Sequence, residues 1–252
     1  MWQTEVVRKT PTARDRARAE LTAEIKTEAR RQLAAHGADA LSLRAVAREL
    51  GMVSSAIYRY FPSRDDLLTA LIIDSYDALA DRVEQAIAEC PEDDHEARWL
   101  AACRAVRKWA LEHPHEYALI YGTPIPGYRA PRDTVEPAAR VPYALLGVVR
   151  DAWLAGRLTV VEPDVALSPA MTAQLDRVAA LTGVGEVPRP TLTTVLIAWT
   201  QLFGMVSFEL FGHFTGVFDD TTTVFEHVIR QLANLIGFRL DERPAAELDK
   251  PA

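Results

Sequence analysis

A group of residues between positions 44 and 60 could bind a polyanion. Its members are Arg44, Ser54, Ser55, Ala56, Tyr58, Arg59 and Tyr60. The small residues at 54–56 would let one end of a helix approach a duplex closely, and the hydroxyl groups can donate to phosphate oxygens. The guanidinium of Arg44 can donate two hydrogen bonds to the edge of a guanine. These residue types are therefore suited to recognition of double-stranded DNA, and they are equally compatible with a plain three-helix bundle that partly buries Tyr58 and Tyr60.

Two short helices joined by a tight turn would have to position this cluster. Ser42 can cap the first helix, and Gly51 ends it. The second helix opens at Ser54 or the residue before it and stops before Pro62, because the residue preceding a proline is pushed out of the α region. A longer amphipathic helix is expected over about 16–36. This order is typical of a helix-turn-helix, whose second short helix enters the major groove.

The rest of the chain is predicted to be helical as well. Ser63 and Asp66 form a capping-box pattern for a long fourth helix that continues to Pro91. Further helices are expected over about 95–113, 115–121, 135–156, 169–182, 190–213 and 220–239. No segment shows a convincing alternation of polar and apolar residues with the period of a strand.

The predicted fold class is therefore all-α. An N-terminal three-helix helix-turn-helix domain over 16–66 is expected to precede a larger helical domain over 67–240. A flexible basic arm is expected over 1–15 and a polar tail over 241–252.

Positive charge is concentrated in the first quarter of the chain. The first 64 residues hold 12 lysines and arginines against 7 acidic residues, whereas the remainder holds 16 against 28, within an overall charge of −7. A basic head on an acidic body indicates that one end meets an anion. The arm is either a solvated tail or an extension that adds phosphate or minor-groove contacts. Its basic residues are Arg8, Lys9, Arg14, Arg16 and Arg18.

Composition excludes several other classes of protein. Of the 252 residues, 49% are hydrophobic and 25% charged, which is typical of a soluble globular protein. Charge or proline interrupts the apolar runs, so neither a membrane span nor a signal peptide is expected. Cys90 and Cys103 are too few for a disulfide framework and lack metal-ligand spacing. We therefore predict no metal, no cofactor and a cytoplasmic location.

The stretch from Leu43 to Leu68, LRAVARELGMVSSAIYRYFPSRDDLL, resembles the signature of the TetR family of bacterial transcriptional regulators. The shared features are an Ala-x-x-Leu-Gly core, a Tyr-x-Tyr-Phe end of the recognition helix and an Arg-x-x-Leu segment after it. The resemblance covers about residues 16–70.

The resemblance implies a role for individual positions. It implies DNA contacts by Arg44, Ser54, Ser55, Ala56, Tyr58, Arg59, Tyr60 and Arg64, the last as a contact to the DNA backbone. Ile57 and Phe61 match inward-facing positions and are not expected to touch DNA. The chain departs from the usual pattern at Val53, Ser55 and Tyr60, so the base preference is not predicted.

Two segments of the C-terminal part, 99–131 and 208–213, resemble the WHG-type subgroup of the family. This resemblance implies a helical domain that binds an effector and dimerises. Aromatic side chains with a few polar anchors could line its pocket. The candidates are Trp109, His113, Tyr117, Tyr121, Tyr128, Trp153, Trp199, Phe203, Glu209 and His213. The alternative is that these aromatic residues form the core.

The last two predicted helices, 190–213 and 220–239, are apolar over much of their surface, which is consistent with one contact inward and one to a second copy. The family resemblance implies a homodimer through these helices. It favours a repressor that binds a palindromic operator and is released by a small apolar or aromatic effector. The expected partners are operator DNA, that effector and a second copy of the chain, with no membrane.

Three alternatives compete with this hypothesis. His113, His115 and Glu116 invite a metal-enzyme interpretation, although ligands two residues apart do not share a helix face. An architectural DNA-binding protein would show no ligand response. A plain three-helix bundle would bury Tyr58 and Tyr60 partly in its core.

Overall fold

The computed structural model describes residues 12–161 and 165–238, and these residues divide into two compact units. One unit comprises the chain up to Ile72 together with Thr123–Pro131, and the other comprises Ile73–Gly122 and the chain from Arg132 onward. We expected a second domain that is continuous from residue 67. Instead, the proline-rich loop after Gly122 belongs to the N-terminal unit, where the Tyr128 and Thr69 hydroxyls lie 2.9 Å apart.

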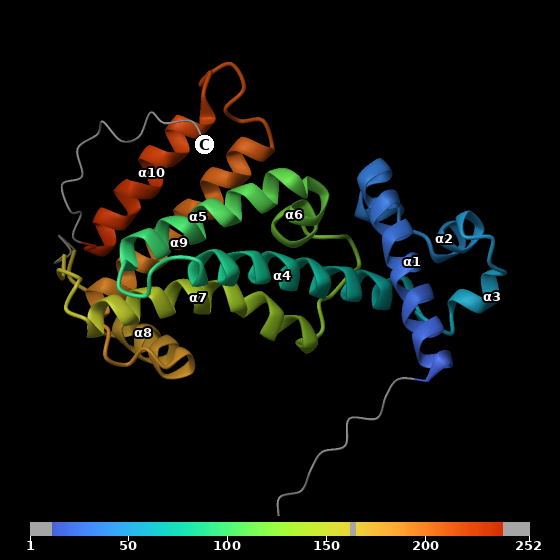
Figure 1. Ribbon diagram of the computed structural model, residues 1–252, viewed down its shortest axis with the longest axis horizontal. Helices are drawn as coiled ribbons and strands as arrows, with labels where there is room; N and C mark the ends of the chain where they lie inside the picture. The colour runs from blue at the N-terminus through green and yellow to red at the C-terminus, as the bar shows by residue number, and fades with distance from the viewer. Residues whose placement is uncertain (1–11, 162–164, 239–252) are drawn as a thin grey trace, which may run out of the picture. The chain divides into compact units, whose positions relative to one another are not determined.

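The described residues form ten α-helices and two short 3-10 helices, with no strand longer than an isolated bridge between Leu158 and Phe238 (Figure 1). The all-α prediction is confirmed. The N-terminal unit holds α1 (Ala13–His36), η1 (Ala38–Ala40), α2 (Leu43–Glu49), α3 (Ser54–Ile57) and the start of α4 (Arg64–Ala88).

Helix α1 begins three residues earlier than the sequence pattern indicated. Thr12 and Asp15 form a capping box, in which the Thr12 hydroxyl accepts from the Asp15 backbone N–H and the Asp15 carboxylate accepts from the Thr12 backbone N–H. Residues 13–15, which we had assigned to the arm, are therefore helical. Residues 1–11 of the predicted arm, including Arg8 and Lys9, lie outside the described residues.

The caps of the next helices were partly predicted. Ser42 occupies the N-cap position of α2, but its side chain makes no capping hydrogen bond. Gly51 adopts a φ of 65° in the turn after α2, a conformation that a residue with a Cβ rarely adopts. The predicted capping box before α4 is confirmed, because the Ser63 hydroxyl accepts from the Asp66 N–H at 3.1 Å and donates to the Asp66 carboxylate at 2.7 Å.

The C-terminal unit contains the rest of α4 and six further helices, with ends close to those predicted. They are α5 (His95–Glu112), α6 (Pro114–Tyr121), α7 (Val135–Leu154), α8 (Pro169–Thr182), α9 (Arg189–Leu210) and α10 (Thr221–Ile236). Helix α5 packs against α7, α9 and α10, and Figure 1 shows α10 beside α9. The buried residues Trp99, Cys103, Val106 and Ala110 form one stripe of α5 and explain its central place.

Charged side chains join α7 to α4 inside this unit. The Arg140 guanidinium contacts three carboxylates of α4, at 2.9 Å from Asp77, 2.6 Å from Asp81 and 2.7 Å from Glu84. These acidic residues lie one helical turn apart, so without Arg140 they would repel one another.

Helix α9 bears on the expectation that no segment spans a membrane. It is 22 residues long, and an apolar window of 18 residues within it has a mean hydropathy of 1.4, which makes the helix long and apolar enough to cross a membrane by length and composition. Half of the apolar window is buried inside the unit, however, where α9 packs against α5, α8 and α10. An apolar helix at the centre of a helical unit has the same composition as a membrane span because both are surrounded by apolar groups.

Candidate nucleic-acid interface

The first two helices of the chain determine which side of α3 faces outward. Ile57 is fully buried, with Val46 and Ala47 of α2 and Ile25 and Ala29 of α1 also buried in this small unit. Residues two positions apart on a helix are rotated by about 200°. Because the Ile57 side chain points inward, those of Ser55 and Arg59 point outward, and both residues are exposed.

The structure places the predicted DNA-binding residues on or near this outward surface. Arg44, Ser54, Ser55, Tyr58 and Arg59 are exposed, whereas Ala56, Tyr60 and Arg64 are partly buried. Ile57 and Phe61 are 0% and 6% exposed, which confirms that they face inward. Tyr58 is 42% exposed and so does not belong to a core, contrary to the plain-bundle alternative.

The recognition helix is shorter than predicted. Its α-helical part ends at Ile57, and the chain continues as a tightened turn in which the N–H groups of Arg59 and Tyr60 donate to carbonyls three residues earlier, at 3.1 and 2.9 Å. Pro62 then prevents further helix. Tyr58, Arg59 and Tyr60 thus stand on a turn whose backbone is still hydrogen-bonded.

Arg18 of α1 contacts this turn, a role that the sequence did not predict. Its guanidinium donates to the Arg59 carbonyl at 3.1 Å and lies 5.3 Å from the centre of the Tyr60 ring. The contact crosses 41 positions of sequence, and no local pattern signals it. The sequence pattern places Arg18 among the basic residues of the arm. In the structure it belongs to α1 and packs against the Tyr60 ring.

Arg64 also makes internal contacts. Its guanidinium donates to the carbonyls of Leu41 at 3.2 Å and Ala38 at 2.8 Å, and it lies 3.6 Å from the Asp65 carboxylate. These bonds join the start of α4 to the chain before α2. Replacing Arg64 is therefore expected to cost stability, which the sequence alone did not suggest.

Two arginines of the surface have unused donors. Within the described part of the chain, the guanidinium groups of Arg44 and Arg59 make neither a hydrogen bond nor an ion pair. Arg48 differs, since it lies 3.7 Å from the Glu49 carboxylate. Exposed and uncompensated guanidinium groups are suited to phosphates or guanine edges.

Comparison with known proteins identifies the chain. A family model described as bacterial regulatory proteins of the tetR family matches residues 25–71, which contain α2 and α3. A second, described as a tetracyclin repressor-like C-terminal domain, matches residues 99–232. The chain belongs to the TetR family. The matched descriptions do not test the WHG-type subgroup, which stays a prediction.

Several TetR-family relatives cover nearly the whole chain. HTH-type transcriptional regulators of Mycobacterium tuberculosis and Mycobacterium bovis are 39% identical over 223 residues, which is 88% of this chain and 94% of theirs. The crystal structure of a regulatory protein, SCO4313, has a TM-score of 0.71 and 39% identity, and the match covers 88% of this chain and all of that one. The HTH-type transcriptional repressor DrrR1 of Streptomyces coeruleorubidus is 35% identical over 112 residues, 42% of this chain and 38% of DrrR1.

This TetR-family chain is thus a transcriptional regulator with a helix-turn-helix DNA-binding domain, and the enzyme alternative is dropped. The residues that suggested a metal enzyme have other contacts. The His113 ring lies against Trp109, with centroids 5.3 Å apart, and its Nδ1 is 4.0 Å from the Glu116 carboxylate. The described residues contain no group of three or more side chains suited to hold a metal.

The structure separates the ten residues proposed to line an effector pocket. Tyr117, Tyr121 and Phe203 meet in an aromatic cluster, with the Tyr121 ring 5.2 Å from Tyr117 and 4.5 Å from Phe203. Tyr117 is fully buried, and its hydroxyl donates to the Phe203 carbonyl at 3.2 Å. Trp109 is buried in the core of the unit and Trp153 packs against that core. These five aromatic side chains pack against one another or against the core of the unit.

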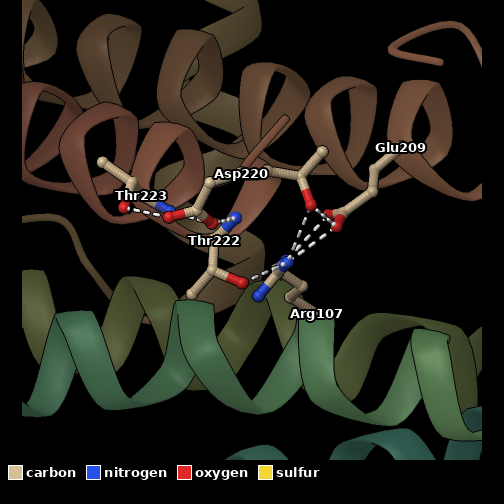
Figure 2. Close-up of polar contacts among 6 residues, drawn as sticks. Arg107, Glu209, Asp220, Thr222 and Thr223 are labelled. Carbon is tan, nitrogen blue, oxygen red and sulfur yellow. Dashed lines mark hydrogen bonds and ion pairs between the residues drawn. The ribbon is translucent and has the colours of Figure 1, made fainter. Parts of the chain in front are cut away.

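The other candidates differ in their surroundings, and Trp199 contacts the Phe203 ring of this cluster, with centroids 6.3 Å apart. His113 and His213 are exposed, and Tyr128 belongs to the N-terminal unit. Glu209 forms a bidentate ion pair with Arg107 of α5, with N–O distances of 2.6 and 2.7 Å (Figure 2). The Arg107 guanidinium holds the pKa of the Glu209 carboxyl below its ordinary value of 4.5. Trp199 alone of the ten borders an open cavity described below.

The Arg107–Glu209 pair joins three helices. The Thr221 hydroxyl at the start of α10 donates to Glu209 at 2.7 Å, and Arg107 also donates to the Thr222 hydroxyl at 3.1 Å (Figure 2). Asp220 caps α10 by accepting from the N–H groups of Thr222 and Thr223, at 2.9 and 3.1 Å. Glu209 is therefore a structural group at the end of α9, with no free oxygen to anchor a ligand.

Proposed function

We propose that this TetR-family regulator is a cytoplasmic repressor that binds a palindromic operator as a homodimer. The residues that contact DNA are Arg44, Ser54, Ser55, Ala56, Tyr58, Arg59 and Tyr60. Arg64 positions the helices instead, because its guanidinium already donates to backbone carbonyls within the unit and has few donors left for DNA. A small apolar or aromatic effector bound in the C-terminal unit releases the DNA.

The observation that carries the DNA-binding part is the outward surface of α2 and α3. It presents two uncompensated guanidinium groups, Arg44 and Arg59, beside the hydroxyls of Ser54, Ser55 and Tyr58. Burial of Ile57 fixes which side of α3 faces outward. Phosphate contacts position a protein on DNA and base-edge contacts specify the sequence, and this surface has donors for both.

Dimerisation through α9 and α10 is supported by apolar side chains that the unit leaves uncovered. Ile197 and Phe208 of α9 are 47% and 53% exposed, and Phe211, directly after the helix, is 47% exposed. Val224 and Val228 of α10 are partly buried and pack against the core. A two-fold dimer would pair these faces isologously, and the two recognition helices would bind half-sites one helical turn or a multiple of it apart. The repressor assignment is supported by the name of the relative DrrR1.

Selection of binding sites from random duplex DNA tests this proposal. We expect enrichment of an inverted repeat whose half-site centres are separated by about 10–10.5 base pairs or a multiple. Phe208→Glu should convert the dimer to a monomer in analytical ultracentrifugation and abolish binding to the repeat. Val217→Glu serves as the matched control, because Val217 is 66% exposed and lies in the loop after α9. Binding without sequence preference would instead support the architectural alternative.

A further inference from the structure

An apolar cavity of about 310 Å³ lies among α7, α8 and α9 of the C-terminal unit. Helix α7 contributes Pro142 and Leu146, α8 contributes Leu175 and Val178, and α9 contributes Val195 and Trp199. None of the twelve lining residues is charged. The cavity shares no lining residue with the cluster of Tyr117, Tyr121 and Phe203, although the Trp199 ring on its wall lies 6.3 Å from that of Phe203.

The cavity has a buried floor and an exposed rim. Leu145, Leu175 and Leu192 are at most 5% exposed, whereas Val178 and Leu196 at the rim are both 41% exposed. Apolar side chains around this cavity remain in contact with water. Covering them with an apolar ligand would lower the free energy. The volume falls within the range of small-molecule sites and is about twice that of a cavity known to hold benzene.

Three side chains of the lining carry polar groups, namely Tyr143, Thr182 and Trp199. Tyr143 is 49% exposed, and its hydroxyl can donate or accept a hydrogen bond. The Thr182 hydroxyl donates to the Val178 carbonyl at 2.8 Å within α8 and is thereby occupied. Pro142, inside α7, has no N–H group. The Trp199 Nε1 is buried and has no hydrogen-bond partner among the described residues. A charged ligand would lose its hydration here without gaining a counter-charge.

We infer that this cavity binds an uncharged, largely apolar small molecule with a planar or chain-like body about two benzene rings in size. The inference rests on the proposed effector response and names the site and the ligand class for it. A second copy of the chain is the competing occupant, because Leu196 on the rim is next to Ile197 of the proposed dimer face. The buried floor of Leu145, Leu175 and Leu192 favours a small molecule that can enter below the rim. The ten residues predicted from the sequence contribute only Trp199 to it.

Titration of the full-length protein with the uncharged fluorophore N-phenyl-1-naphthylamine, without DNA, tests the inference. Val178→Trp on α8 and Leu196→Trp on α9 should each fill the cavity from one wall and raise the dissociation constant about tenfold or more. Val135→Trp provides the matched control, since Val135 is 65% exposed on α7 and does not line the cavity. Circular dichroism establishes that each variant is folded.

Competition separates ligand classes. We expect 1-decanol to displace the fluorophore at about one tenth of the concentration that decanoate requires, because no cation compensates the carboxylate. Equal displacement by both, or fluorophore binding unaffected by both tryptophan variants, overturns the inference. The inference is also overturned if the wild-type protein binds no fluorophore and Val178→Trp converts the dimer to a monomer. That result would mean that a second copy of the chain covers the cavity.

Failure of this inference differs from failure of the proposed function. If operator binding is intact in a mobility-shift assay while the fluorophore does not bind, the cavity assignment is wrong and the DNA-binding proposal stands. If the fluorophore binds and both tryptophan variants weaken it, the cavity assignment stands whether or not an operator is found.

Discussion

Replacing Glu209 with alanine is expected to destabilise the C-terminal unit by about 2–3 kcal/mol. The change removes two short ionic hydrogen bonds to Arg107, whose side chain is 14% exposed, while that of Glu209 is 10% exposed. Breaking a fully buried ion pair costs about 3–5 kcal/mol. We place Glu209→Ala below that range because Arg107 retains some solvent contact and keeps the Thr222 hydroxyl as an acceptor.

Thermal unfolding followed by circular dichroism measures this effect. For a unit of this size a loss of 1 kcal/mol lowers Tm by about 2–4 °C, so the expected decrease is about 5–10 °C at pH 7.5. Glu226→Ala is the matched control. Glu226 forms a similar bidentate pair with Arg104 of the same helix α5, but the side chains are 32% and 45% exposed. Exposed pairs contribute little, so this control should lose about 1 kcal/mol or less.

The dependence on pH has a definite sign. Arg107 lowers the pKa of Glu209 in the folded protein below its ordinary value of 4.5. A carboxyl whose pKa is lowered by folding contributes stability that is complete above its unfolded pKa and is lost as the pH falls through its folded pKa. The difference in stability between wild type and Glu209→Ala should therefore be constant from about pH 6 to 8 and shrink below about pH 4.5.

A double-mutant cycle supplies the refuting result. The double variant Arg107→Met/Glu209→Ala should lose less stability than the sum of the losses in the two single variants, by at least about 1 kcal/mol. Each single variant leaves one unpaired buried charge, whereas the double variant leaves none. Additive losses would mean that the two side chains stabilise the unit independently. That outcome, or a Glu209→Ala effect no larger than that of Glu226→Ala, would refute the reasoning from burial.

Three further substitutions test the other contacts. Tyr58→Ala should weaken operator binding about tenfold in a mobility-shift assay and change the free energy of unfolding by less than about 0.5 kcal/mol, because the side chain is exposed. Arg64→Ala should lower the free energy of unfolding, measured by urea denaturation, by about 1–2 kcal/mol, because it removes the hydrogen bonds from Arg64 to two backbone carbonyls. Arg140→Met should destabilise by about 1 kcal/mol at low salt, because the three α4 carboxylates then repel one another, and the loss should diminish in 1 M NaCl.

Each of these has a contradicting result. Wild-type operator affinity in Tyr58→Ala would remove this residue from the DNA surface. Unchanged stability in Arg64→Ala would show that its contacts to the chain before α2 are dispensable. A salt-independent loss in Arg140→Met would point to packing of the side chain and not to charge.

Short-range patterns were sufficient to predict much of this protein from its sequence. The capping box at Ser63 and Asp66, Gly51 in the turn and Pro62 after the recognition helix act within a few residues, and each lies where the sequence placed it. Burial of Ile57 and Phe61 follows from the same local periodicity together with the family signature. The sequence thus determined the helices, the family and the outward residues of the helix-turn-helix.

Tertiary structure decided what the sequence left open, because the deciding contacts join residues far apart in the chain. Arg18 reaches the turn at Arg59 across 41 positions, and Glu209 pairs with Arg107 across 102. An aromatic or charged residue at helical spacing has the same local pattern whether it fills the core, pairs with a distant partner or borders a cavity. Only the packing of α7, α8 and α9 distinguishes Trp199, beside open space, from Tyr117, which is enclosed on all sides.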